Sequence, residues 1–487
     1  MLLLVAVPAI QPVSDPDFFW HLQVGNWILS HHAIPRHDLF TFTVADHAFI
    51  AHEWLSEVII AAVTSLSGLG GVALFFGAIT WLGFLVLLAT PRGVGYVIGG
   101  LALVIGVAAG NPIWGPRTQM LTFALLCAEL LALRRYRESG DRRWLYPLPP
   151  MFLLWANLHA GFTAGLGVFA LYIAGEWLTR RFGGHGNPPA TVPALRPLLL
   201  TGLASLLIVV INPNFFGLYI YAAQTQFSPA QQQLIVEWQS PNFHMLEVRA
   251  YEGMLLLLVA LLALSHFRIR LTDLLLLLAG IVLSLQSVRH IAIFVAIATP
   301  LLAELGQAGY ESWRDRLRLR EPPHNVVFGV ANLTIIFILA VIVFVATAPG
   351  WSSNPRSKAV RRDYPVAALD HIAADPPPGN LFNQYGWGGY LVYRLWPLRQ
   401  VYIYGDAAVM GDAFLREYEA IQNLHPDYSA ILQRRQVAWV IFPRDAPLEV
   451  VLRDSPDWVV VYHDRLASVL VRRSPQTRAY LGSHGFE

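Results

Sequence analysis

The sequence predicts an α-helical polytopic membrane protein with about eleven transmembrane helices, a long first external loop that carries amphipathic helices, and a small extracytoplasmic C-terminal α/β domain. Of its 487 residues, 55% are hydrophobic and only 14% are charged, whereas an average soluble domain carries about 25% charged residues. Several apolar runs approach the roughly 20 residues that a bilayer crossing needs. After residue 348 the composition changes, and strand-like runs alternate with helical ones.

Hydropathy and helix-breaking residues divide the apolar part into candidate crossings. These are 1–13, 69–90, 94–112, 117–134, 146–159, 160–178, 195–212, 250–266, 271–287, 289–306 and 326–348. The first run is short, because at 1.5 Å per residue it reaches only about 20 Å of a roughly 30 Å hydrocarbon core. It is either a short helix or a signal peptide, although it has neither a basic n-region nor a clear cleavage site.

The distribution of arginine predicts the orientation of these crossings. If residues 14–68 are external and the crossings alternate, fifteen arginines fall in inner loops and four in outer loops. This asymmetry places the C-terminal region outside the membrane. The net charge of +2 gives no indication of nucleic-acid binding, and the single cysteine, Cys127, excludes an intrachain disulfide and a Cys-based metal site.

The first external loop, residues 14–68, contains two expected helices. Apolar residues recur at Trp20, Val24, Trp27 and Ile28, which is the spacing of an amphipathic helix. The stretch "HEWLSEVIIAAVTSL" is too short to span a bilayer comfortably, so we expect it to lie along the membrane surface. Most of the unusual polar residues of the apolar part fall in the external loops, which indicates a protein that works at its external face.

The motif "SDPDFFWHL" places two acids at the start of this loop. One interpretation is helix capping, with Ser14 or Asp15 as the N-cap, Pro16 in the first turn and Asp17 at the positive end of the helix dipole. The other is catalytic, because carboxylates at a membrane edge are costly and often functional. Either Asp15 or Asp17 would accept a proton from a substrate hydroxyl, or one or both would bind a divalent cation.

Three further residues of the loop are candidates for the same site. His52 and Glu53 could complete a Mg²⁺ or Mn²⁺ shell with Asp17, or they could simply be a solvated helix start, because adjacent helix residues do not share a face. His21 is either part of the pocket or an interfacial side chain beside a tryptophan. A divalent cation, Mg²⁺ or Mn²⁺, is therefore the one cofactor that these residues suggest.

Other external residues suit an anionic ligand. Arg117, Arg289 and His290 lie at the outer ends of crossings, where they could bind a phosphate or instead contact lipid headgroups. His159, in "WANLHAGF", is either a hydrogen-bonded core residue or part of a helix break that lines a cavity. Glu237, in "VEWQSPNF", is either a second carboxylate near the site or a loop charge.

Residues 351–487 predict a small α/β domain on the outer face. The expected strands are 400–405, 437–443, 457–463 and 468–473, and the expected helices are 364–374, 411–424, 427–435 and 446–454. The segment "YGWGGY" is interpreted as a turn or loop without a phosphate-binding pattern. The segment "YGDAAVMGD", with Asp406 and Asp412, is interpreted either as a plain exposed loop or as a loop that faces the membrane site.

This arrangement resembles the GT-C superfamily of membrane glycosyltransferases, which includes protein mannosyltransferases, aminoarabinose transferases and oligosaccharyltransferases. The resemblance rests on "SDPDFFWHL" at the end of the first crossing, more weakly on "AHEWLSE", and on the plan of a module at 1–348 followed by the domain at 351–487. It implies transfer of a hexosyl or pentosyl sugar from a polyprenyl-phosphate donor to a glycan, lipid or protein acceptor at the external face of a cell membrane, in bacteria the inner membrane. It also implies that Asp15 or Asp17 is the general base or a metal ligand, and that Arg117 or Arg289 neutralises the leaving phosphate. The chain departs from familiar members in having D-P-D rather than two adjacent acids.

Two other functions fit the same composition. A transporter would carry ionisable residues near the middle of its crossings, whereas Glu129, Glu176 and Glu304 lie toward the predicted inner ends. A non-catalytic scaffold for envelope assembly or lipid-linked intermediates would use the external domain for binding. An external pocket that unites Asp15 or Asp17 with Arg117 and Arg289 would favour the enzyme over both.

Overall fold

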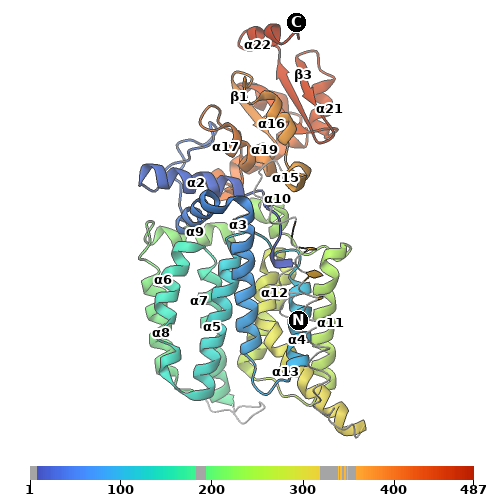
Figure 1. The fold of residues 1–487 in the computed structure, drawn as a ribbon. Coiled ribbons are helices and arrows are strands. Elements are labelled where there is room, and N and C mark those ends of the chain that lie inside the picture. The colour runs from blue at the N-terminus through green and yellow to red at the C-terminus, as the bar shows by residue number, and fades with distance from the viewer. Residues whose placement is uncertain are drawn as a thin grey trace. The chain divides into compact units, whose positions relative to one another are not determined.

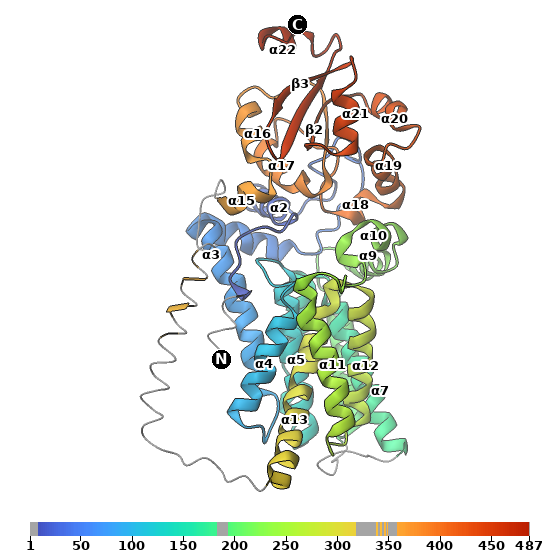
Figure 2. The ribbon, with the colours of Figure 1, turned by 90° about the vertical axis from the view of Figure 1, so that its right-hand side faces the viewer.

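The computed structural model describes residues 8–182, 193–317 and 358–486, with a few isolated residues between 338 and 348. The chain forms two compact units, each assembled from segments that are far apart in the sequence (Figure 1, Figure 2). The first, called the helical unit, comprises Met1–Gln11, Ala73–Phe215 and Val236–Trp351. The second, called the mixed unit, comprises Pro12–Val72, Phe216–Ile235 and Ser352–Glu487.

The helical unit is a bundle of long helices that run side by side (Figure 1, Figure 2). Its helices are the second part of α3 (Trp54–Ala89), α4 (Tyr96–Ala109), α5 (Gln119–Ser139), α6 (Leu148–Leu158), α7 (Phe162–Phe182), α8 (Leu195–Ile208), α11 (Arg249–Leu264), α12 (Leu271–Gln286) and α13 (Ile291–Leu317). α13 packs against α4 and α12, and α12 also packs against α7. Helices that are apolar on all sides suit such a core or a lipid environment, because neither offers water to a polar face.

Each predicted crossing between residues 69 and 306 overlaps one of these helices. Among the described residues, three helices are long and apolar enough to cross a membrane: Trp54–Ala89, Phe162–Phe182 and Val288–Asp315. Tyr96–Ala109, Leu195–Ile208 and Leu271–Gln286 are apolar but shorter. The number of eleven crossings is therefore not confirmed. Most of the predicted crossings 1–13 and 326–348 lies outside the described residues.

Helix α3 covers both the helix expected at 52–66 and the apolar helix expected at 69–90. Gly68 separates the two parts with φ 66° and ψ −169°, a backbone conformation that is not helical. This combination is open to glycine and strained for residues with a Cβ. The sequence prediction of two helices at 52–66 and 69–90 is therefore confirmed, with Gly68 as the break between them.

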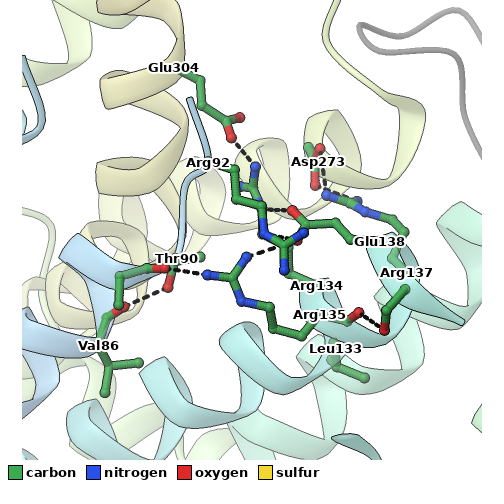
Figure 3. A network of polar contacts seen from close by, with 12 residues as sticks. Val86, Thr90, Arg92, Leu133, Arg134, Arg135, Arg137, Glu138, Asp273 and Glu304 are labelled. Atoms are coloured by element: carbon green, nitrogen blue, oxygen red, sulfur yellow. Dashed lines mark hydrogen bonds and ion pairs between the residues drawn. The ribbon is translucent and has the colours of Figure 1, made fainter. Parts of the chain in front are cut away.

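One end of the helical unit carries a network of ion pairs (Figure 3). Arg137 makes a bidentate contact with Asp273, with nitrogen-to-oxygen distances of 2.8 and 3.3 Å. Arg134 pairs with Glu304 and Glu138, and Glu138 also pairs with Arg92, at 3.0 Å. Arg137 is buried and links α5 to α12.

We expect Arg137→Met to lower the stability of the protein by about 1.5–3 kcal/mol, because Asp273 then loses a bidentate, charge-assisted contact. The loss should appear as a lower thermal unfolding midpoint in detergent. Arg142→Met, at an exposed position shortly after the same helix, is the matched control and should change little. Equal midpoints for the two variants would show that the buried pair contributes no net stability.

The mixed unit contains a four-stranded sheet with the order β1-β2-β4-β3, in which β1 (Asn380–Asn383) is parallel to β2 (Val437–Pro443). β4 (Ala467–Arg472) is antiparallel to both β2 and β3 (Trp458–His463). The helices of the unit are α2 (Phe18–His31), the first part of α3, α9 (Gly217–Gln226), α10 (Pro229–Leu234), α15 (Lys358–Asp363), α16 (Val366–Ile372), α17 (Gly388–Leu395), α18 (Ala407–Met410), α19 (Asp412–Gln422), α20 (Tyr428–Arg434), α21 (Pro447–Arg453) and α22 (Arg478–Ser483). The buried strand β2 forms the centre of the core, in agreement with its uninterrupted apolar sequence.

Two features of the sheet differ from the expectations for the C-terminal region. The run 400–405 joins no strand ladder in the described residues, and only Val401 forms a bridge, with Thr41. The edge strand is β1 instead, whose four residues are too few to show a period. The segment "YGWGGY" begins with a turn, as expected, and its last three residues are the start of α17.

Candidate active site

The two carboxylates of the D-P-D motif have different local contacts. Asp15 Oδ1 accepts the backbone N–H of Asp17 at 2.7 Å, so this side chain closes the turn before α2. Asp17, rather than Ser14 or Asp15, is the N-cap residue of α2, and its side chain makes no capping hydrogen bond. Asp17 Oδ1 instead accepts the indole N–H of Trp20 at 3.1 Å. The half-buried Asp17 carboxylate is therefore oriented without taking part in helix capping.

His21 lies between two buried carboxylates, one turn along α2. Its Nε2 is 3.6 Å from Glu53 Oε2, and its Nδ1 is 3.1 Å from Glu57 Oε1. Glu53 and Glu57 are one helical turn apart at the start of α3, so they face the same neighbour. The three side chains form a buried acid–imidazole–acid cluster in the mixed unit.

His52 extends this cluster. Its Nε2 is 3.2 Å from Glu53 Oε1 and 3.2 Å from the hydroxyl of Tyr221, whose ring stacks on the imidazole. Glu53 therefore contacts two histidines that lie on opposite sides of it. His52 and Glu53 contact each other although they are adjacent in sequence. They can do so because His52 precedes the first turn of α3 and does not follow helical spacing.

These contacts shift the pKa values of both imidazoles upward. Burial lowers the pKa of His21, but Glu53, Glu57 and Asp17 outweigh burial and raise this pKa to about 9. Burial also lowers the pKa of His52. The negative charges of Glu53 and Asp406 act in the opposite direction, and the pKa of His52 lies above its usual value. Asp17 is thus one of the acids that interact electrostatically with His21.

The helical unit holds a second charged cluster. Arg117 forms an ion pair with Glu237, which lies in the 3₁₀ turn Val236–Trp238. Arg289 lies over the ring of Trp238, with its guanidinium carbon 4.4 Å from the ring centroid. Burial raises the pKa of Glu237, but Arg117 and Arg289 outweigh it, so the pKa lies below its usual range. Among the described residues, no carboxylate lies within ion-pair distance of Arg289.

The structure therefore brings together several residues that the sequence could only suggest. Arg117, Arg289 and Glu237 form one cluster, and His290 lies beside it with its ring centroid 6.0 Å from that of Trp238. His159 lies at the break between α6 and α7, where its Nδ1 contacts Thr122 Oγ1 and accepts the N–H of Gly161, both at 2.8 Å. These contacts agree with a hydrogen-bonded core histidine.

The proposed cation ligands were tested against the same geometry. Within the part of the chain that the structure describes, no group of three or more His, Cys, Asp or Glu side chains has an arrangement that could hold a metal ion. Both oxygens of Glu53 face imidazoles, and His52 Nε2 contacts Tyr221. A cation site formed by Asp17, His52 and Glu53 stays a prediction.

Solved structures with a similar fold cover nearly the whole chain. ArnT from Cupriavidus metallidurans bound to undecaprenyl phosphate has a TM-score of 0.51 and 15% sequence identity, over 98% of this chain and 97% of ArnT. The oligosaccharyltransferase AglB from Archaeoglobus fulgidus, in complex with an inhibitory peptide and a dolichol-phosphate, has a TM-score of 0.51 and 11% identity, over 91% of this chain and 68% of AglB. The chain has the GT-C fold. AglB tethered to an acceptor peptide gives a TM-score of 0.54 with the same identity and coverage. No protein-family model and no curated protein sequence matches the chain.

The GT-C fold confirms the resemblance inferred from "SDPDFFWHL" and from the order of elements. At 11–15% identity it establishes the architecture, and the roles of individual residues rest on the geometry of this chain. Asp15, Asp17, His21, His52 and Glu53 lie in the mixed unit, whereas Arg117, Arg289, His290, His159 and Glu237 lie in the helical unit. That the two sets form one pocket stays a prediction.

The sequence prediction missed Glu57 and misjudged the burial of Asp406. Glu57 lies one turn after Glu53, and this spacing was the available signal that both acids share a face. Asp406 was noticed, but "YGDAAVMGD" was interpreted as exposed, whereas Asp406 is only 4% exposed. Asp406 Oδ1 accepts the N–H of Val409, and the negative charge of Asp406 contributes to the raised pKa of His52.

We expect His21→Gln to destabilise the protein in a pH-dependent way. The folded-state pKa of about 9 exceeds the ordinary 6.5, so the stabilisation is fully present below about pH 6.5 and is lost as the pH rises through 9. The variant should lose about 2–3 kcal/mol at pH 6 and much less at pH 10, measured by thermal unfolding. His31→Gln, at an exposed position of the same helix, is the control. An equal loss at both pH values would contradict a protonated, doubly paired His21.

Proposed function

We propose that the protein is a membrane glycosyltransferase that moves a sugar from a polyprenyl-phosphate donor to an acceptor hydroxyl at the extracytoplasmic face of a cell membrane. The GT-C fold supports this proposal, since one structure with this fold is bound to undecaprenyl phosphate and another to a dolichol-phosphate. The apolar helices support a membrane location. The arginine asymmetry of the sequence supports a multi-pass topology with the C-terminal region outside.

The observation that carries the proposal is the environment of Asp17. Its carboxylate is half-buried, is oriented by the indole of Trp20 and lies near protonated His21. An ionised carboxylate in this place can accept the proton of an acceptor hydroxyl as that oxygen attacks the anomeric carbon of the sugar. Asp15 has the different role of closing the turn that places Asp17.

The charged cluster of Arg117, Arg289 and Glu237 contains the cations that the leaving phosphate would need. When the bond between the anomeric carbon and the phosphate oxygen breaks, that oxygen keeps the electron pair and polyprenyl phosphate gains negative charge. Arg289 suits this charge, because its guanidinium is held by Trp238 and lies outside ion-pair distance of the described carboxylates. Arg117 is paired with Glu237, so it would bind phosphate only by sharing or exchanging this partner.

The test is a transfer assay with the purified full-length protein in liposomes. Undecaprenyl-phosphate and dolichol-phosphate donors carrying a single hexose or pentose are supplied together with candidate glycan, lipid and peptide acceptors. Release of free polyprenyl phosphate together with a sugar on the acceptor is the expected result. Release of neither product from any donor, while the folded protein stays in the membrane, would contradict the enzyme and favour a scaffold.

A further inference from the structure

Two glycines of the C-terminal region lie directly against the acid motif within the mixed unit. A Cβ placed on Gly405 would lie 1.5 Å from Asp17 Oδ1 and 2.9 Å from Trp20 Nε1. A Cβ placed on Gly389 would lie 2.5 Å from the carbonyl oxygen of Pro16. Real Cβ atoms essentially never approach other atoms within 3.0 Å. Only glycine therefore fits at these positions while Asp17 and Trp20 keep their places.

The backbone of residues 402–405, which includes Gly405, is held in place by burial and hydrogen bonds. Tyr402, Ile403 and Tyr404 are fully buried. The side chain of Asn383 accepts the N–H of Tyr402 at 2.9 Å and donates to the carbonyl of Ile403 at 2.9 Å. The hydroxyl of Tyr385 donates to the carbonyl of Gly405 at 3.2 Å. A clash at Gly405 would therefore displace Asp17 rather than the pinned backbone.

We propose that Gly405 is a positioning residue for Asp17. The segment 402–406 acts as a rigid wall that, together with the Trp20 N–H, fixes the Asp17 carboxylate in one orientation. This role assigns a purpose to the motifs "YGDAAVMGD" and "YGWGGY", since each supplies one of the two glycines. The catalytic part of the inference rests on the proposed function, because it takes Asp17 as the base.

The expected size of the effect follows from the geometry of base catalysis. A displacement of about 1 Å of a catalytic group can cost about 10²-fold in rate. Gly405→Ala should therefore lower kcat by about 10–100-fold and change KM for the donor by less than about threefold, because no substrate-binding group is removed. Gly386→Ala is the matched control, since its Cβ would meet only the flexible side chain of Gln384, at 3.3 Å.

A stability cycle tests the contact without any activity measurement. Gly405→Ala should lower the thermal midpoint of the otherwise unchanged protein, because the methyl group overlaps the Asp17 carboxylate. In an Asp17→Ala background that carboxylate is gone, so most of the loss caused by Gly405→Ala should disappear. A role of Gly405 in folding alone would give the same loss in both backgrounds.

The outcomes separate the two proposals. The positioning role is supported in full if Gly405→Ala lowers kcat and if its loss of thermal midpoint largely disappears in the Asp17→Ala background. Equal losses in both backgrounds, or an unchanged kcat in Gly405→Ala, would overturn it. If the unchanged protein transfers no sugar from any donor, the proposed function fails, and the midpoint cycle alone still decides whether Gly405 positions Asp17.

Discussion

Asp17→Asn is expected to lower the rate of sugar transfer by about 10²–10⁴-fold, the range expected for loss of a general base. The amide keeps the size of the carboxylate and one oxygen that can still accept the Trp20 N–H. It cannot take the proton of an attacking hydroxyl. The fold and the membrane insertion should therefore survive while turnover fails, and the rate is measured as polyprenyl phosphate released from a lipid-linked donor.

Asp15→Asn is the matched control for this variant. Its side-chain oxygen can still accept the N–H of Asp17 and close the turn before α2. We therefore expect Asp15→Asn to keep most of the activity. A result in which Asp15→Asn is inactive and Asp17→Asn is active would exchange the two roles and make Asp15 the base.

Arg289→Ala is expected to lower kcat/KM for the donor by about 10²–10³-fold. A guanidinium that neutralises a leaving phosphate is worth about 2.7–4 kcal/mol of transition-state stabilisation when it acts in a dehydrated site. Arg289 is half-buried and lies over Trp238, so its removal leaves the developing charge without this partner. The measurement is the dependence of the initial rate on donor concentration in liposomes of fixed composition.

Two variants make this prediction specific. Arg289→Lys keeps the charge but loses the planar, bidentate group, so it should recover only part of the activity. Arg249→Ala removes an exposed arginine that pairs with Glu252 at the start of α11, and it should behave like the unchanged protein. If Arg249→Ala and Arg289→Ala lower kcat/KM for the donor equally, the effect comes from general membrane electrostatics rather than from phosphate binding.

The sequence carried enough information for the elements that depend on local pattern. Long apolar runs predicted the helices α4 to α8 and α11 to α13, and short strand-like runs predicted β2, β3 and β4. The position of D-P-D at the start of an amphipathic helix drew attention to Asp17 before any geometry was known. These features depend on residues that are close in sequence, so periodicity and turn chemistry were sufficient to find them.

The features that the sequence did not predict depend on contacts between distant segments. Gly405 meets Asp17 across almost four hundred residues, and such a contact leaves no local pattern. The same reason explains why Asp406 was taken as exposed, since its burial comes from the surrounding fold and not from its neighbours. The short strand β1 was missed because pairing with β2, rather than its own composition, makes it a strand.

The most direct measurement is the amount of polyprenyl phosphate released per sugar transferred, compared between the unchanged protein and Asp17→Asn in the same liposomes. We predict one molecule of free polyprenyl phosphate for each sugar on the acceptor, and almost none of either product from Asp17→Asn at equal folded protein. Equal turnover by the two proteins, or sugar transfer without release of polyprenyl phosphate, would contradict a lipid-phosphate donor and a base at Asp17.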